Sequence, residues 1–133
     1  MLKFSNSQLG YLVVRIAMGL SLLMHGGVRI PKWGAFSTAT ADSFADTILP
    51  YGLVYVFASV IIIGEVLSGV LLLLGGRFVR WGCALGILLM GFLMFGSGML
   101  EQWQGVMNQI VHVLILYLLL INPNTQDPTM SRE

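Results

Sequence analysis

The sequence predicts an all-α integral membrane protein, a four-helix bundle with a short amphipathic interfacial helix between the first and second spans. Of its 133 residues, 56% are hydrophobic and only 10% are charged, a composition outside the usual range of soluble domains. The apolar residues also form four runs of about the length that a helix needs to cross the ~30 Å hydrocarbon layer. These runs are 8–28, 53–75, 81–100 and 105–121.

The first run follows a short polar lead, residues 1–7. It is too long for the core of a signal peptide and lacks a small-x-small cleavage pattern, so we expect a retained membrane helix. Pro31 ends this helix, because proline cannot continue the hydrogen-bonding pattern, and Lys32 and Trp33 then form an interfacial anchor.

The polar connector before the second span predicts a short amphipathic helix over about 38–49, lying on the membrane surface. Its apolar residues recur at helical spacing while polar residues fill the other face. Those apolar residues are Ala41, Phe44, Ala45 and Ile48. Ser37 or Thr38 would cap the start of the helix. An ordered loop is the alternative interpretation.

The second, third and fourth spans are separated by short polar turns. The third span carries Gly82-x-x-x-Gly86, a pattern of small residues that lets membrane helices approach closely. The fourth carries Asn108 and His112 one turn apart. A polar tail, residues 123–133, follows the last span, and we expect it to be disordered.

Four spans place both termini on one side of the membrane. Four basic residues fall on that side and two in the opposite loops: Lys3, Arg77, Arg80 and Arg132 against Arg29 and Lys32. The positive-inside rule therefore favours cytoplasmic termini, in a multi-pass protein of a bacterial inner membrane.

Charge and cysteine content exclude several function classes. The net charge is +1 and no basic run is present, so we expect no nucleic acid partner. The single cysteine permits neither an internal disulfide nor a CxxC redox motif. The eight methionines form no MxxM or MxM cluster, so they predict helix packing and no metal site.

The most informative residue is Glu65, a carboxylate in the middle of the second span. An ionisable group at this depth costs about 2.5 to 3.5 kcal/mol on insertion scales, so it should face the protein interior and have a partner. Counting residues from the membrane surfaces puts Arg15 at a depth within reach of Glu65. We therefore expect an Arg15–Glu65 pair, which either tunes the acid or only pins two helices together.

Two histidines extend this polar set. The same depth estimate predicts a ladder in which Glu65, His112, Asn108 and His25 rise from mid-membrane toward the outer interface. Ser68, Gly69 and Gly86 would line it. Each histidine also has a structural alternative: His25 can bond a free carbonyl at its helix end, and His112 can bond Glu65 or Asn108. Two such histidines can also ligate a b-type haem, which their unequal depths disfavour.

These features together resemble the DoxX family of four-helix membrane proteins, over residues 9–122. The resemblance rests on Arg15, on His25-Gly26 at the end of the first span, and on Glu65 followed by Gly69 and a leucine run. Where the family has HGxxK and E-x-x-G-G, this chain has Arg29 in place of the lysine and Ser68 in place of the first paired glycine. The resemblance implies membrane complexes. Some relatives are subunits of quinone-reducing enzymes such as thiosulfate:quinone oxidoreductase, and others are linked to complexes that handle thiol and oxidative stress.

The favoured hypothesis is a small integral subunit of a membrane redox complex that binds a quinone. Glu65 would exchange protons, Arg15 would tune it, and His112 or His25 would bond the ring oxygen. Gly26, Ser68, Gly69 and Asn108 would complete the binding site. The chain has no motif for an electron carrier, so a partner subunit would supply the redox centre. The alternatives are a structural accessory subunit that packs on other membrane helices and holds lipid or pigment, and a small transporter that works as a homo-oligomer.

Overall fold

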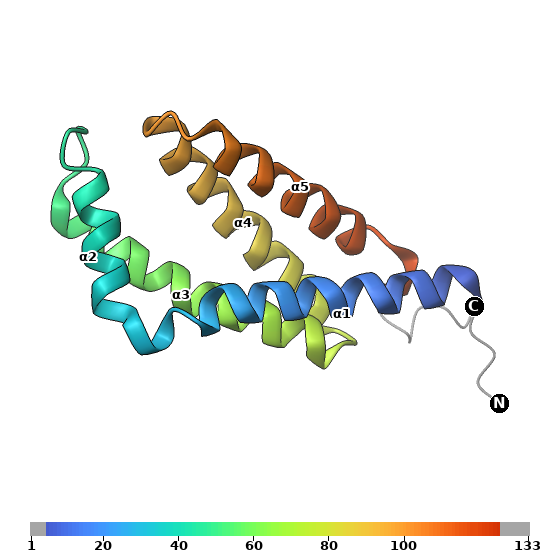
Figure 1. Cartoon of the computed structure of the whole chain (residues 1–133). Coiled ribbons are helices and arrows are strands. Elements are labelled where there is room, and N and C mark those ends of the chain that lie inside the picture. Colours follow the sequence, from blue (N-terminus) through green and yellow to red (C-terminus); the bar gives the residue numbers. More distant parts are fainter. Residues whose placement is uncertain (1–4, 126–133) are drawn as a thin grey trace.

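The computed structural model describes residues 5–125 as a succession of helices (Figure 1). In chain order these are α1 (Asn6–Gly27), the 3-10 turn η1 (Ile30–Lys32), α2 (Trp33–Ser43), α3 (Tyr51–Leu74), α4 (Phe78–Met99), α5 (Trp103–Leu120) and the 3-10 turn η2 (Pro123–Thr125). Four helical segments are long and apolar enough to cross a membrane: Asn6–Ser43, Tyr51–Leu74, Phe78–Met99 and Trp103–Leu120. The predicted all-α four-helix membrane bundle is confirmed.

Helices α1 and α3 run antiparallel and touch through their glycines. A Cβ added to Gly26 would lie 2.7 Å from the carbonyl oxygen of Ile62, and one added to Gly69 would lie 2.5 Å from the backbone nitrogen of Leu23. Association of helices inside a bilayer depends on close packing, since lipid is as apolar as leucine. These two glycines therefore fix the register of α1 along α3.

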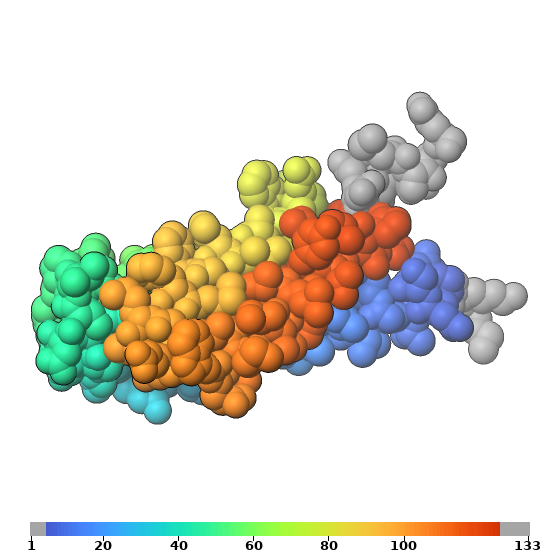
Figure 2. Space-filling model, turned by 90° about the horizontal axis from the view of Figure 1, so that it is seen from above, coloured from blue at the N-terminus to red at the C-terminus, as the bar shows by residue number. Residues whose placement is uncertain are grey.

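A second set of close contacts joins α3 to the hairpin of α4 and α5. The Ser68 hydroxyl donates to the carbonyl of Gly82 at 2.7 Å, which ties α3 to α4. Gly75 and Gly76, with φ of 78° and 55°, make the turn between these helices in a left-handed conformation that suits glycine. Figure 2 shows the α4–α5 hairpin covering the middle of the molecule, with α2 at one end and the start of α1 at the other.

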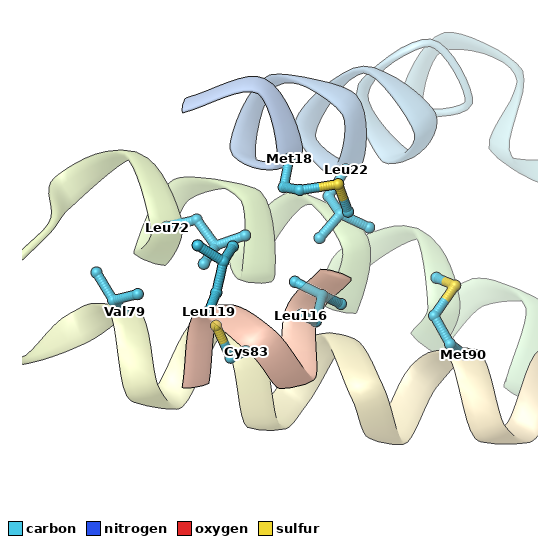
Figure 3. Close-up of a cluster of buried hydrophobic side chains, with 8 residues drawn as sticks. All are labelled: Met18, Leu22, Leu72, Val79, Cys83, Met90, Leu116 and Leu119. Atoms are coloured by element: carbon cyan, nitrogen blue, oxygen red, sulfur yellow. The ribbon is translucent and has the colours of Figure 1, made fainter. Parts of the chain in front are cut away.

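A buried apolar core fills one end of the bundle. Figure 3 shows side chains from α1, α3, α4 and α5 converging there: Met18, Leu22, Leu72, Val79, Cys83, Met90, Leu116 and Leu119. We call this region the closed end. A smaller core of Ala41, Phe44 and Val54 joins α2 to the start of α3. We call that region, with the adjoining parts of α3 and α4, the open end.

The outer surface of the bundle is apolar. On α3 the exposed side chains follow one helical stripe, namely Leu53, Val56, Val60, Ile63, Leu67, Val70 and Leu74. The opposite face of α3 buries its small and polar residues. This distribution is the reverse of that in a soluble helix and is consistent with contact between these helices and the lipid bilayer.

Helix α1 ends beside the middle of α3. Gly26, at its last turn, contacts Ile62 and Val66, and the chain then turns through Val28–Lys32. Beyond the turn, the indole nitrogen of Trp33 donates to the hydroxyl of Ser59 at 2.9 Å. The segment from α1 to α2 therefore runs along α3 with a break in its middle.

The helix after this break begins and ends earlier than the predicted 38–49. It spans Trp33–Ser43, and Ser37 lies inside it, in hydrogen-bonding contact with Ser59 instead of capping its start. Ser43 and Thr47 donate to the carbonyls of Thr40 and Phe44. Such local side-chain bonds compete with continuation of a helix, which explains why the apolar spacing up to Ile48 was misleading.

The other helices begin two or three residues before the predicted runs. At α1, Ser5 and Gln8 form a capping box that begins the helix before the apolar run. Residues 123–125 of the tail that was expected to be disordered instead form η2, in which Thr125 is buried and donates to the carbonyl of Leu119. Residues 1–4 of the predicted lead and residues 126–133 of the predicted tail lie outside the described residues.

Candidate functional site

Four helices meet at one level of the bundle, and the polar residues lie one turn beyond it. A Cβ added to Gly86 would touch Leu116, Ser68 and Leu22, so these side chains share that level. One helical turn toward the open end lie His25 on α1, Glu65 on α3 and His112 on α5. This packing brings together three polar residues that lie far apart in the sequence. We call them, with Arg29, the polar layer.

Glu65 is paired with Arg29. The carboxylate is 2% exposed, and its Oε2 lies 2.5 Å from Nη1 of Arg29. Arg29 belongs to the break after α1, and its guanidinium also lies 4.7 Å from the centre of the Phe36 ring. Oε1 of Glu65 accepts no hydrogen bond from residues 5–125. The acid is thus held by one oxygen and free at the other.

The predicted Arg15–Glu65 pair is wrong. Arg15 donates from Nη1 to the carbonyl of Leu72 at 3.2 Å and packs against Gly75. This contact lies about 10 Å from Glu65 along α3, which is two helical turns. The depth estimate assumed that α1 and α3 begin and end at the same membrane surfaces, whereas α1 is displaced along α3. Arg15 satisfies a carbonyl at the end of a helix instead.

The two histidines of the polar layer contact each other. Their ring centroids are 5.9 Å apart and the planes are 85° from parallel, an edge-on arrangement. Both imidazoles lie close enough to Glu65 for electrostatic interaction. Nδ1 of His25 lies 2.7 Å from the carbonyl oxygen of Ser21, and Nδ1 of His112 lies 2.8 Å from that of Asn108. Neither Nε2 has a hydrogen-bond partner within the described part of the chain.

Asn108 takes no part in this layer. Its side chain is exposed and accepts from Nε2 of Gln104 at 3.3 Å, so its predicted place between the two histidines is wrong. The prediction counted depth along α5 and gave no weight to the direction of the side chain. Only the backbone carbonyl of Asn108 contributes, by holding His112.

The remaining predicted residues lie at helix contacts around the layer. Gly26 and Gly69 join α1 to α3, and Ser68 joins α3 to α4. They bring the helices together at the level from which His25 and Glu65 project.

Arg29 is the residue of the polar layer that sequence reasoning missed. The sequence analysis counted it only among the basic residues of the loops opposite the termini. Two signals in the sequence point to it: it lies four residues after His25, and it occupies the position of the lysine in the DoxX pattern. A basic residue between a glycine pair and a proline can enter a bundle where the helix breaks.

An apolar cavity of about 480 Å³ lies at the open end, between α2, α3 and α4. Its lining includes the rings of Phe57 and Phe92, which contact each other edge-on at 5.1 Å, and it includes no charged residue. The cavity follows the stripe of α3 that carries Ala58 and Ile61, and Glu65 is the next residue of that stripe. The cavity therefore reaches to within one helical turn of the acid.

Comparison with protein-family models, with curated proteins and with solved structures finds no match for this chain. Within residues 5–125, no group of three or more His, Cys, Asp or Glu side chains is placed to hold a metal ion. The polar layer and the cavity beside it are therefore the observations from which a function can be argued.

Proposed function

We propose that this chain is a small membrane subunit of a redox complex that binds a quinone. The quinone ring would lie at the polar layer, and the apolar tail of the quinone would lie in the cavity. One observation carries this proposal: a buried carboxylate paired with Arg29 and two imidazoles with free Nε2 atoms lie at one level of an apolar bundle, one turn from an uncharged cavity.

The chemistry of a quinone matches these surroundings. Small-molecule sites are mostly apolar, with a few well-placed polar groups that orient the ligand. A quinone is an uncharged ring with two oxygens and an apolar chain, and its conversion to the hydroquinone exchanges two protons and two electrons. Side chains that hold and release protons must then lie within reach of the ring oxygens. Glu65, His25 and His112 are side chains of that kind.

Arg29 takes the role that was predicted for Arg15. Its guanidinium fixes Glu65 through Oε2 and leaves Oε1 for a ligand. This arrangement stabilises a charge that is otherwise costly at this depth. In this proposal Arg29 is a positioning residue, because it acts on the ligand through the acid.

The electrons belong to a partner subunit, since the chain carries no CxxC or other electron-carrier motif. Its apolar outer surface is available to lipid and to other membrane helices. With Arg29 engaged in an ion pair, Lys32 alone remains of the basic residues opposite the termini. That asymmetry favours cytoplasmic termini. Membership of the DoxX family is part of this proposal.

A second candidate function is suggested by the cavity alone. An uncharged, aromatic-lined cavity also suits a lipid chain or an apolar pigment. In that case the polar layer would only hold the helices together, and the protein would be a structural accessory subunit.

Replacing Glu65 separates the two candidates. The purified protein is placed in nanodiscs, and binding of a short-chain benzoquinone is measured by calorimetry for the natural protein, Glu65→Gln and Glu101→Gln. Glu65→Gln keeps the shape of the side chain and removes its charge. We expect it to weaken binding at least tenfold, while Glu101→Gln, at an exposed turn, leaves binding unchanged.

Two results would contradict the quinone proposal. If Glu65→Gln binds the quinone as tightly as the natural protein does, the polar layer has no part in binding. If the natural protein takes up lipid and no quinone, the accessory role is correct.

A further inference from the structure

Polar side chains recur every four residues along α5, from its first turn to the polar layer. Gln104, Asn108 and His112 lie on one face of the helix, because residues four apart are neighbours there. Nε2 of Gln104 donates to Oδ1 of Asn108 at 3.3 Å, and the carbonyl oxygen of Asn108 lies 2.8 Å from Nδ1 of His112. We call these three residues the polar stripe. At ~1.5 Å per residue, the polar stripe leads about 12 Å into the span from the open end.

The polar stripe meets α1 at the polar layer. The ring of His112 contacts that of His25, with centroids 5.9 Å apart, and both imidazoles lie close enough to Glu65 for electrostatic interaction. Arg29, which pairs with Glu65, follows His25 by four residues. A series of polar side chains therefore leads from Gln104, at the start of α5, to the buried acid.

This series interrupts the apolar outer surface of the bundle. Gln104, Asn108 and His25 are exposed, and the side chain of Arg29 is 26% exposed although it pairs with a buried carboxylate. On α3, and on α4 beyond its first turn, no exposed residue carries an amide, an imidazole or a charge. The side of the bundle formed by α1 and α5 thus differs from the sides that α3 and α4 present to lipid.

Hydrocarbon does not suit such a surface. Polar side chains without hydrogen-bond partners are costly in an apolar medium, and a charged group costs more. Ionisable residues of membrane spans therefore face a bundle interior or a water-filled space. The break after α1 has the same requirement, because irregular backbone at membrane depth occurs where it is buried in protein or borders water. Water along the polar stripe would satisfy the exposed amides, the imidazoles and the guanidinium of Arg29.

We infer that water from the side of the membrane opposite the termini reaches the polar layer along the polar stripe, so that Glu65 exchanges protons with that side. A proton that Glu65 takes up comes from this water, and a proton that it releases returns there. The inference goes beyond the proposed function, because it assigns a side of the membrane to the polar layer whichever ligand the layer binds.

Cysteine accessibility tests whether the polar stripe is hydrated. The natural Cys83 is fully buried and gives little background. Asn108→Cys is compared with Met107→Cys and Ile110→Cys, which flank it along α5 at positions that are 58% and 45% exposed. The full chain is reconstituted in lipid vesicles and treated with a membrane-impermeant, positively charged thiosulfonate. A thiol must ionise to react, which requires water. We expect Asn108→Cys to be labelled at least tenfold faster than both controls.

Two reference variants identify the side from which the water comes. Lys32→Cys is exposed opposite the termini, and Arg77→Cys is exposed on the side of the termini. In vesicles that hold the protein mainly in one orientation, reagent added outside should label Asn108→Cys to the same fraction as Lys32→Cys. Infrared difference spectra then follow the carboxyl band that Glu65→Gln removes, while the pH is changed on one side only. We expect this band to respond to the pH opposite the termini.

The outcomes are independent of the quinone proposal, because no quinone is present in these measurements. If Asn108→Cys is labelled no faster than Met107→Cys and Ile110→Cys, another helix or lipid covers the polar stripe and the inference is wrong. It is also wrong if Asn108→Cys is labelled to the same fraction as Arg77→Cys, or if the Glu65 band follows the pH on the side of the termini. Each of these results leaves quinone binding to be decided by its own assay.

Discussion

The two ends of the bundle are packed in different ways. At the closed end, eight buried side chains from four helices form one apolar core (Figure 3). At the open end, a three-residue core borders a cavity of about 480 Å³. Tight packing is the main source of helix association in lipid, so the closed end holds the four helices together. The open end can keep a cavity, with the Arg29–Glu65 pair beside it, because the opposite end supplies the packing.

Arg15 and Arg29 also differ between the two ends of the bundle. Arg15, toward the closed end, satisfies a carbonyl near the end of α3. Arg29, in the break next to the open end, pairs with a buried acid. Both contact α3, but Arg15 bonds a backbone carbonyl whereas Arg29 bonds a carboxylate.

The largest expected effect comes from removing one partner of the ion pair. Arg29→Met leaves Glu65 charged and unpaired inside the bundle, which should lower the free energy of unfolding by about 3 to 5 kcal/mol. Arg15→Met removes a single hydrogen bond and should cost about 1.5 to 3 kcal/mol. Both values are measured by chemical unfolding in mild detergent, followed by tryptophan fluorescence. A larger loss for Arg15→Met would reverse the assignment of the two arginines.

The next effect tests the contact that sets the register of α1. Gly26→Ala places a methyl group 2.7 Å from the Ile62 carbonyl oxygen and should destabilise the protein by about 1 to 3 kcal/mol. Gly27→Ala is the matched control, because a Cβ there has nothing within 4 Å. It should be neutral or slightly stabilising, since alanine favours helix over glycine. Equal losses in the same unfolding assay would contradict the proposed register.

Enlarging one small residue at each end tests the packing difference itself. Cys83→Leu adds volume to a fully buried position of the closed end and should cost about 1 to 3 kcal/mol. Ala58→Leu extends into the cavity of the open end, so we expect less than about 1.5 kcal/mol of destabilisation but loss of quinone binding. Unfolding and calorimetry on both variants give the comparison. If Ala58→Leu still binds the quinone, the cavity is not the site that holds the apolar tail of the quinone.

The smallest effect concerns the bond between α3 and α4. Ser68→Ala removes the hydroxyl that donates to the Gly82 carbonyl, and side-chain bonds between membrane helices are worth about 0.6 kcal/mol on average. Ser43→Ala, whose bond to Thr40 is exposed and local, serves as the control and should change stability less. If Ser68→Ala and Ser43→Ala have the same free energy of unfolding, glycine packing alone joins α3 to α4.

Sequence reasoning succeeded for features that the bilayer itself requires, namely the membrane-spanning helices and the inward orientation of Glu65. A span in lipid must satisfy all its backbone groups, so length and hydropathy were enough to find four helices. The cost of a buried charge was enough to turn Glu65 inward. His25 and His112 lie in contact at one level, one turn from the level at which the helices meet, whereas the depth estimate placed them at different depths with Asn108 between them.

Sequence reasoning failed for contacts that depend on how one helix is displaced along another. The register of α1 on α3 comes from backbone contacts at Gly26 and Gly69, and depth counted from the membrane surface carries no information about such contacts. The wrong partner for Glu65 followed directly from that displacement. The prediction for Asn108 was wrong for a related reason, since depth does not define the direction of a side chain.

The break after α1 has a consequence for how the protein is made. Its backbone stays bonded through the turn, from Val28 to Met24 and from Lys32 to Arg29, so the change of direction leaves these amides satisfied. The charge that it carries has no such local partner and is neutralised only by a residue of the next span. Each of these two spans on its own would insert with an unpaired ion, at an energetic cost. Insertion of α1 and α3 as a pair would avoid this cost, because each span would neutralise the charge of the other.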